Sequence, residues 1–213
     1  MIRVAKSSVI PCSLSTTKAY DGSDVLQQLE DDHHMKCYLC ERSLCTDFQV
    51  EHHQSKEIYP ELRQDWNNLF WTCAYCNGKK LHQFDNLLHP ATVNIEDEIE
   101  QIMDFSNKKA MFTPLKETDK HEETCRLLTR IHNGTKKMRT KREENFIEYV
   151  LGVVNNFYRL VCKYLSNPND ENSALVREEL QIEKECLGFK YWIIRSKPQL
   201  LEAFGNDVIW NKQ

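Results

Sequence analysis

The stretch that decides the fold of this chain reads Cys37-Tyr-Leu-Cys40, then Glu51-His52-His53, then Asn67-Asn68-Leu69, and finally Cys73-Ala-Tyr-Cys76-Asn77-Gly-Lys-Lys80. Each C-x-x-C pair can turn back so that its two thiolates point at one ion, and two such pairs supply the tetrahedral ligand set of a structural zinc. A stretch this short buries too little apolar surface to hold its shape without such an ion. We therefore expect the four cysteines of the two pairs to bind one structural Zn²⁺.

The other cysteines fit the same interpretation. The chain has nine cysteines, an odd number, which fits metal binding in a reducing compartment better than a disulfide framework. Cys45 lies close enough in sequence to be a substitute ligand or a free thiol. The remaining four are expected to be ordinary thiols, namely Cys12, Cys125, Cys162 and Cys186. A thioredoxin-like redox role is disfavoured, because neither pair lies in a β-α-β pattern.

Composition sets the outer limits. The chain has 213 residues, 40% of them hydrophobic, which is enough for one large domain or for a small module with a helical domain. Its 28 basic and 32 acidic residues give a net charge of −4, so any DNA contact must come from a local patch or a partner. Because the start lacks a signal peptide and no apolar run approaches about 18 residues, we expect a cytoplasmic protein without a membrane partner.

Local sequence patterns predict the secondary structure between the two cysteine pairs. Residues 47–53 alternate as a strand does, residues 66–71 bring the chain back, and residues 73–81 form a polar turn that opens into a helix. The expected topology is strand, strand, helix. Glu51 then lies near a strand end, and since neighbours on a strand point to opposite faces, only one of His52 and His53 can face the same side as a substrate.

This arrangement of Cys-x-x-Cys, acidic-His, Asn-Leu and Cys-x-x-Cys-Asn-x-x-Lys resembles the HNH endonucleases of the ββα-metal superfamily. The resemblance implies metal-dependent hydrolysis of DNA phosphodiester bonds. It makes His52 the general base and Asn68 the amide that orients it, with Glu51 and Asn77 as ligands of a catalytic Mg²⁺ or Mn²⁺. In relatives with a His-His pair the first histidine can bind metal and the second can act as the base, so His53 is the alternative catalytic residue.

A finer likeness covers about residues 37 to 90. The segments Glu51-His-x-x-x-Lys56, Tyr59-Pro-Glu-Leu62, Asp65-Trp-Asn-Asn-Leu-Phe70 and Cys76-Asn-Gly-Lys-Lys80 resemble the nuclease subunits of Septu anti-phage defence systems, the PtuB family, and their restriction-associated relatives. The resemblance implies a complex with an ATPase subunit of the ABC or SMC-like, PtuA type. Two alternatives stay open: a stand-alone restriction-type HNH nuclease, and a catalytically idle zinc module that binds nucleic acid or protein.

We predict an α+β fold in three parts. Residues 1–36 are a lead-in, with a strand at 2–4, a loop at 11–17 and a helix from 23 capped by Ser23 or Asp24. Residues 37–90 form the HNH core. Residues 91–213 form a hairpin, with strands at 99–105 and 110–112, followed by a mainly α-helical domain. A helical stripe through Ile95, Ile99 and Ile102 is the alternative to the hairpin.

Apolar spacing predicts helices at 120–133, 137–165 and 173–186, with Asn133-Gly134 ending the first, and the segments 189–194 and 200–204 complete the apolar set. This set either packs on the core as a simple bundle or docks a partner. Several cations could follow a DNA backbone or simply be solvated, namely Lys79, Lys80, Lys136, Lys137, Arg139, Lys141 and Arg142. The sequence has no Gly-rich phosphate loop, so we do not expect this chain to hydrolyse ATP itself.

Overall fold

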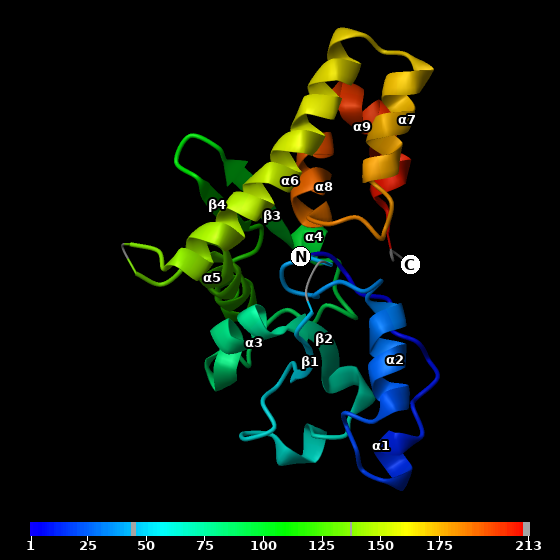
Figure 1. Ribbon diagram of the computed structural model, residues 1–213, viewed down its shortest axis with the longest axis vertical. Coiled ribbons are helices and arrows are strands. Elements are labelled where there is room, and N and C mark those ends of the chain that lie inside the picture. Colours follow the sequence, from blue (N-terminus) through cyan, green and yellow to red (C-terminus); the bar gives the residue numbers. More distant parts are fainter. Residues whose placement is uncertain (44–45, 137, 211–213) are drawn as a thin grey trace.

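A computed structural model describes residues 1–43, 46–136 and 138–210. Figure 1 shows an elongated molecule, with α1, α2, β1 and β2 toward one end and α7 and α9 toward the other, and with α6 running from the middle of the molecule to the end that holds α7. The helices are α1 Ser13–Thr16, α2 Ser23–Asp32, α3 Ala74–Lys80, α4 Ile95–Glu98, α5 Asp119–Asn133, α6 Lys141–Ser166, α7 Asp170–Glu179, α8 Leu187–Arg195 and α9 Pro198–Phe204. The strands are β1 Phe48–His52, β2 Leu69–Cys73, β3 Ile99–Asp104 and β4 Lys109–Pro114.

The strand, strand, helix order is confirmed for β1, β2 and α3. The two strands are antiparallel, with Phe48 opposite Cys73 and Glu51 opposite Phe70. Every residue of β2 is buried, because one face of the strand meets α2 and the other packs into the main core. α3 begins directly after Cys73, so the second cysteine pair joins the strand to the helix.

The lead-in differs from expectation at three places. The predicted strand at 2–4 is absent from the described structure, since Ile2 and Val4 bury their side chains in the core while their backbone runs as coil. The predicted loop at 11–17 contains the short helix α1. α2 begins after Gly22, not after Ser23 or Asp24, because the Asp24 carboxylate instead accepts hydrogen bonds from the backbone and hydroxyl of Ser13.

The β3–β4 hairpin is confirmed. Its strands pair from Ile99 opposite Pro114 to Asp104 opposite Lys109. The alternative helical stripe describes only the single turn α4, because the chain becomes extended at Ile99. In the described residues the protein is therefore a mixed helix-and-sheet structure with two small antiparallel sheets.

The helical part follows the predicted stripes, with corrected boundaries. α5 ends at Asn133 as predicted, and Gly134 follows with a φ of 78°. α6 starts at Lys141, not at 137, because Thr140 and Glu143 form a reciprocal capping box. α7 starts at Asp170, not at 173, because the Asn169 side chain caps it, and it ends at Glu179 well before the predicted 186.

Three hydrophobic clusters hold the described residues together. The largest joins the cysteine pairs, Phe70, α5 and the first half of α6, so it has members on both sides of residue 90. A second lies among the rest of α6, α7, α8 and α9, and a third between α2 and β2. The division into three domains stays a prediction. Over the described ranges, none of the helices combines the length and apolar character needed to span a membrane.

Candidate functional site

The two cysteine pairs meet in the core. The Sγ atoms of Cys37, Cys40, Cys73 and Cys76 all lie within 4.8 Å of one another, and all four residues are buried. Tyr38 N donates to the carbonyl oxygen of Trp71 over 3.0 Å, which ties the first pair to β2. Four free thiols at this spacing suit a small tetrahedral cation, so the predicted set can hold a zinc ion. Cys45 lies outside the described residues.

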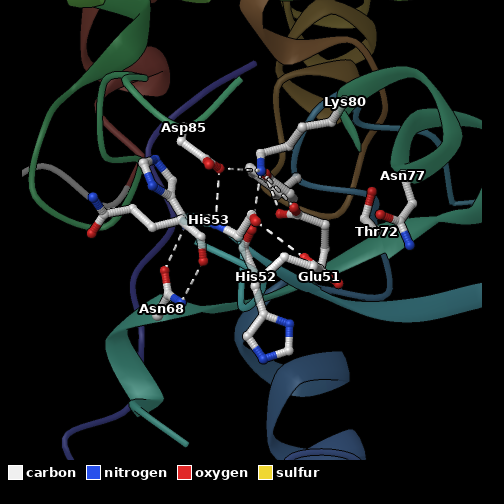
Figure 2. A network of polar contacts seen from close by, with 12 residues as sticks. Glu51, His52, His53, Asn68, Thr72, Asn77, Lys80 and Asp85 are labelled. Atoms are coloured by element: carbon white, nitrogen blue, oxygen red, sulfur yellow. Dashed lines mark hydrogen bonds and ion pairs between the residues drawn. The ribbon is translucent and has the colours of Figure 1, made fainter. Parts of the chain in front are cut away.

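A cavity of about 410 Å³ opens beside the end of β1 and the solvent face of α3. It brings together three of the residues singled out by their pattern, Glu51, His52 and Asn77, together with Lys80. Figure 2 shows Lys80 reaching from α3 toward Glu51 and Asp85. The remaining lining includes Gln49, Val50, Ser55, Lys56, Glu57, Ala74, Gly78, Leu81 and His82.

His52 is held at one ring nitrogen. Its Nε2 lies 3.0 Å from the carbonyl oxygen of Arg63. A carbonyl oxygen only accepts, so Nε2 carries the hydrogen and Nδ1 keeps its lone pair. The Tyr20 ring packs edge-on against the imidazole, with centroids 4.9 Å apart. Burial lowers the pKa of His52, although the Arg63 carbonyl works in the opposite direction. The ring is therefore neutral at pH 7 and able to accept a proton.

His53 points away from the cavity. Figure 2 shows its ring on the other side of the strand from that of His52. Its Nε2 lies 3.3 Å from the carbonyl oxygen of Leu88, and its ring packs against Phe70 and His89. Burial, with a smaller contribution from His89, lowers the pKa of His53 to about 3. This placement favours His52 as the base, and the assignment stays a prediction.

Asn68 bonds the backbone around the two histidines. Its Oδ1 accepts from Gln54 N over 2.7 Å, and its Nδ2 donates to the carbonyl oxygens of Gln54 and Leu62 over 2.9 and 3.2 Å. Its own carbonyl accepts from His53 N over 2.8 Å. Since Leu62 is next to Arg63, the Asn68 amide fixes the loop that supplies the carbonyl partner of His52.

Glu51 is buried and already has two partners. Its Oε2 accepts from the Tyr38 hydroxyl over 2.7 Å, and its Oε1 lies 2.8 Å from Lys80 Nζ. Burial raises the pKa of Glu51, and Lys80 and Tyr38 act in the opposite direction. A carboxylate has about four acceptor positions, so two of them stay available to a cation.

Asn77 is half-buried on α3, and its Nδ2 donates to Gln49 Oε1 over 2.7 Å. Within the described parts of the chain no donor contacts its Oδ1. One carboxylate and one amide oxygen at an open cavity fit the way Mg²⁺ is commonly held, with water and substrate phosphate completing the set. The Lys80 ammonium lies beside Glu51, and its positive charge repels a metal ion that would bind the same carboxylate.

Most of the basic side chains that were candidates for DNA contact form ion pairs or hydrogen bonds with other residues of the chain. Lys80 is 1% exposed and paired with Glu51, so in this conformation it is not available to a phosphate. Lys79 pairs with Glu143, and Arg139 donates to the carbonyl oxygens of Asn133 and Lys108. Arg142 lies 3.9 Å from Asp47. Lys136 and Lys141 are exposed, and Lys137 lies outside the described residues. Their contact with DNA stays a prediction.

Sequence reasoning missed several neighbours of the cavity. Tyr38 lies inside the first C-x-x-C pair, and its spacing from Glu51 gives no sign that its hydroxyl donates to that carboxylate. Asp85, Tyr20 and the Arg63 carbonyl carry no local signal, because they reach the site only through the folded chain.

The described chain is thus a mixed helix-and-sheet protein with a buried cluster of four cysteines that can hold zinc. No protein-family model matches it. Over 48 residues it is 44% identical to the Septu protein PtuB of Bacillus thuringiensis. The matched stretch makes up 21% of this chain and 19% of that relative. Similarity to a Septu protein therefore extends over about a fifth of each chain.

Proposed function

We propose that this chain is a metal-dependent HNH endonuclease that hydrolyses DNA phosphodiester bonds. The observation that carries the proposal is the geometry of His52, which lines the cavity with its Nε2 hydrogen held by the Arg63 carbonyl and its Nδ1 free to accept a proton. Glu51 and Asn77, from β1 and α3, line the same cavity.

In the proposed reaction Nδ1 of His52 takes a proton from the attacking water, while the Arg63 carbonyl stabilises the positive ring that results. The Asn68 side chain keeps the loop of Arg63 in place, so the ring does not rotate as it gains charge. Glu51 and Asn77 would hold a Mg²⁺ or Mn²⁺ ion. When bound, that ion supplies positive charge beside the departing 3′ oxygen.

The similarity to PtuB supports a role in Septu-like anti-phage defence. We propose that the chain is the nuclease subunit of such a complex and acts with an ABC or SMC-like ATPase. The net charge of −4 fits this arrangement, because such a surface attracts DNA weakly and a partner would bring the substrate to the cavity.

A nicking assay tests the proposal. The chain is purified with and without the ATPase and incubated with supercoiled plasmid and Mg²⁺ or Mn²⁺. We expect cleavage by the wild type, loss in His52→Ala and retention in His53→Asn, which keeps a polar side chain at the buried position. Full activity in both variants would end the assignment of the base, and loss only in the His53 variant would exchange the two roles.

A second candidate is a catalytically idle zinc module. The pairing of Glu51 with Lys80 favours it, since an internal ammonium already neutralises the carboxylate. It predicts no cleavage with any combination of metal and ATPase, and binding that survives His52→Ala. A third outcome, cleavage that needs no ATPase, would identify a stand-alone restriction-type nuclease.

A further inference from the structure

The most unusual side chain at the cavity is a lysine that is almost fully buried. Lys80, the last residue of α3, is 1% exposed. Its Nζ lies 2.8 Å from Glu51 Oε1, 3.0 Å from the carbonyl oxygen of His52 and 3.8 Å from Asp85 Oδ1. Figure 2 shows these groups around the end of β1.

These partners come from separate parts of the chain. Glu51 and His52 end β1, whereas Asp85 follows α3 and also accepts a hydrogen bond from Ser55 N over 2.8 Å. Through Asp85, the ammonium is linked to the loop that leaves β1. One cation thus joins the strand end, the loop and the helix that together enclose the cavity.

We propose that Lys80 is a positioning residue, whose ammonium fixes the Glu51 carboxylate and the His52 backbone relative to α3. This inference rests on the proposed function, because it concerns the same cavity. An ammonium has three N–H donors, and the Glu51, His52 and Asp85 oxygens all face it. Lys80 therefore acts on the site through Glu51 and His52 and does not bind a DNA phosphate.

A buried lysine elsewhere supplies the matched control. Lys190 on α8 is 0% exposed, and its Nζ lies 2.8 Å from Glu179 Oε2 and 2.9 Å from the Glu179 carbonyl oxygen. It belongs to the helical part of the molecule, away from the cavity of His52. Removing either lysine takes away a buried ammonium, so Lys190→Met controls for that loss at a place away from the cavity. Glu179 is 32% exposed and keeps Lys184 3.6 Å away, whereas the buried Glu51 loses its nearest cation, so Lys80→Met destabilises the fold more.

The first experiment compares Lys80→Met with Lys190→Met in single-turnover DNA cleavage with Mn²⁺, at a temperature where circular dichroism shows both folded. We expect Lys80→Met to lower the rate constant by about 10- to 100-fold with little change in the Kd for DNA. Lys190→Met should keep the wild-type rate constant. If Lys80→Met and Lys190→Met cleave DNA with the same rate constant, Lys80 only stabilises the fold through its ion pair and the proposal is wrong. A weaker Kd with an unchanged saturating rate constant would make it a phosphate contact instead.

The second experiment needs neither DNA nor activity, so it separates this inference from the proposed function. A proton–nitrogen NMR spectrum of the lysine side chains should show a slowly exchanging Lys80 ammonium, assigned by its loss in Lys80→Met. Glu51→Gln and Asp85→Asn should each shift that signal, and Glu179→Gln should not. A Lys80 ammonium that exchanges as fast as an exposed lysine, or that ignores both substitutions, would overturn the proposal even if the protein cuts DNA.

Discussion

At the scale of single residues, the side chain of Asn68 holds two separate backbone positions in the loop after β1. Its amide accepts a hydrogen bond from Gln54 N and donates to the carbonyl oxygens of Gln54 and Leu62. These bonds hold together the two ends of the loop between β1 and β2. Buried backbone groups that lose such partners are costly, because no water replaces the bonds.

We predict that Asn68→Ala lowers the free energy of unfolding by about 2 kcal/mol, since it leaves buried groups of Gln54 and Leu62 without partners. The measurement is urea unfolding followed by tryptophan fluorescence. Asn67→Ala is the matched control, because Asn67 is the exposed neighbour and its backbone, not its side chain, makes the hydrogen bonds to Asp65 and His89. An equal loss in both variants would contradict the prediction.

His132 provides a prediction about pH. It is buried, and desolvation lowers its pKa from 6.5 to about 4, although the Leu128 carbonyl acts in the opposite direction. Above pH 6.5 neither state binds the proton, whereas between pH 6.5 and 4 the unfolded chain binds it and the folded chain does not. Protonation therefore favours unfolding as the pH falls through this window.

The wild type should thus lose stability relative to His132→Gln between pH 7 and pH 5, by about 2 kcal/mol. Urea unfolding of both proteins at the two values measures the difference. The comparison removes the effects of other titrating groups, since both chains share them. If the difference in the free energy of unfolding between wild type and variant is the same at pH 7 and pH 5, the folded protein does not hold His132 neutral.

The limits of sequence reasoning at this scale are visible in three residues. The four cysteines could be placed because each C-x-x-C spacing is itself a metal-binding pattern, and Asn68 could be placed through the resemblance to HNH endonucleases. Tyr38, Asp85 and the Arg63 carbonyl could not, because a hydroxyl, a carboxylate and a backbone oxygen meet Glu51, Lys80 and His52 only when distant segments fold together. Lys80 was predicted to contact phosphate or to be solvated, and it is instead buried, because helix periodicity does not reveal that the end of α3 is covered.

At the scale of elements, apolar periodicity located α5, α6 and the β3–β4 hairpin but misplaced helix starts. The start of α6 is set by side chains of Thr140 and Glu143 that satisfy backbone N–H groups, not by its apolar stripe. The sequence carried that signal as Thr-x-x-Glu. The start of α7 is likewise set by the polar residue Asn169, whose side chain accepts a hydrogen bond from Asn172 N.

We predict that Thr140→Ala lowers the free energy of unfolding by about 1 kcal/mol, because the N–H of Glu143 loses its acceptor. Thr140→Ser retains the hydroxyl and should behave like the wild type. Thermal unfolding by calorimetry measures both changes. If the serine variant loses as much as the alanine variant, packing of the threonine methyl group and not the cap explains the effect.

At the scale of the whole molecule, the four-cysteine cluster joins the segment before β1 to the β2–α3 corner. Its Sγ atoms lie inside the largest hydrophobic cluster, so the loss of an ion there would disturb the core directly. Structural zinc contributes on the order of 10 kcal/mol to small domains, comparable to the total stability of many proteins.

We therefore predict one zinc per chain by elemental analysis, and a cooperative loss of near-ultraviolet circular dichroism when a strong chelator removes it. Cys76→Ser should abolish stoichiometric zinc. The exposed Cys12 offers the control, and Cys12→Ser should bind zinc and fold like the wild type. Retention of the full signal after complete removal of zinc would contradict a structural role for the ion.

Tyr75 on α3 stacks on Phe146 of α6, with ring centroids 4.6 Å apart, and donates its hydroxyl to the Ile131 carbonyl of α5 over 2.8 Å. The helix that carries Asn77 and Lys80 therefore packs directly on α5 and α6, and Lys79, paired with Glu143, adds a second contact with α6. Either long helix can move relative to this wall of the cavity only if these contacts break or α3 moves with it.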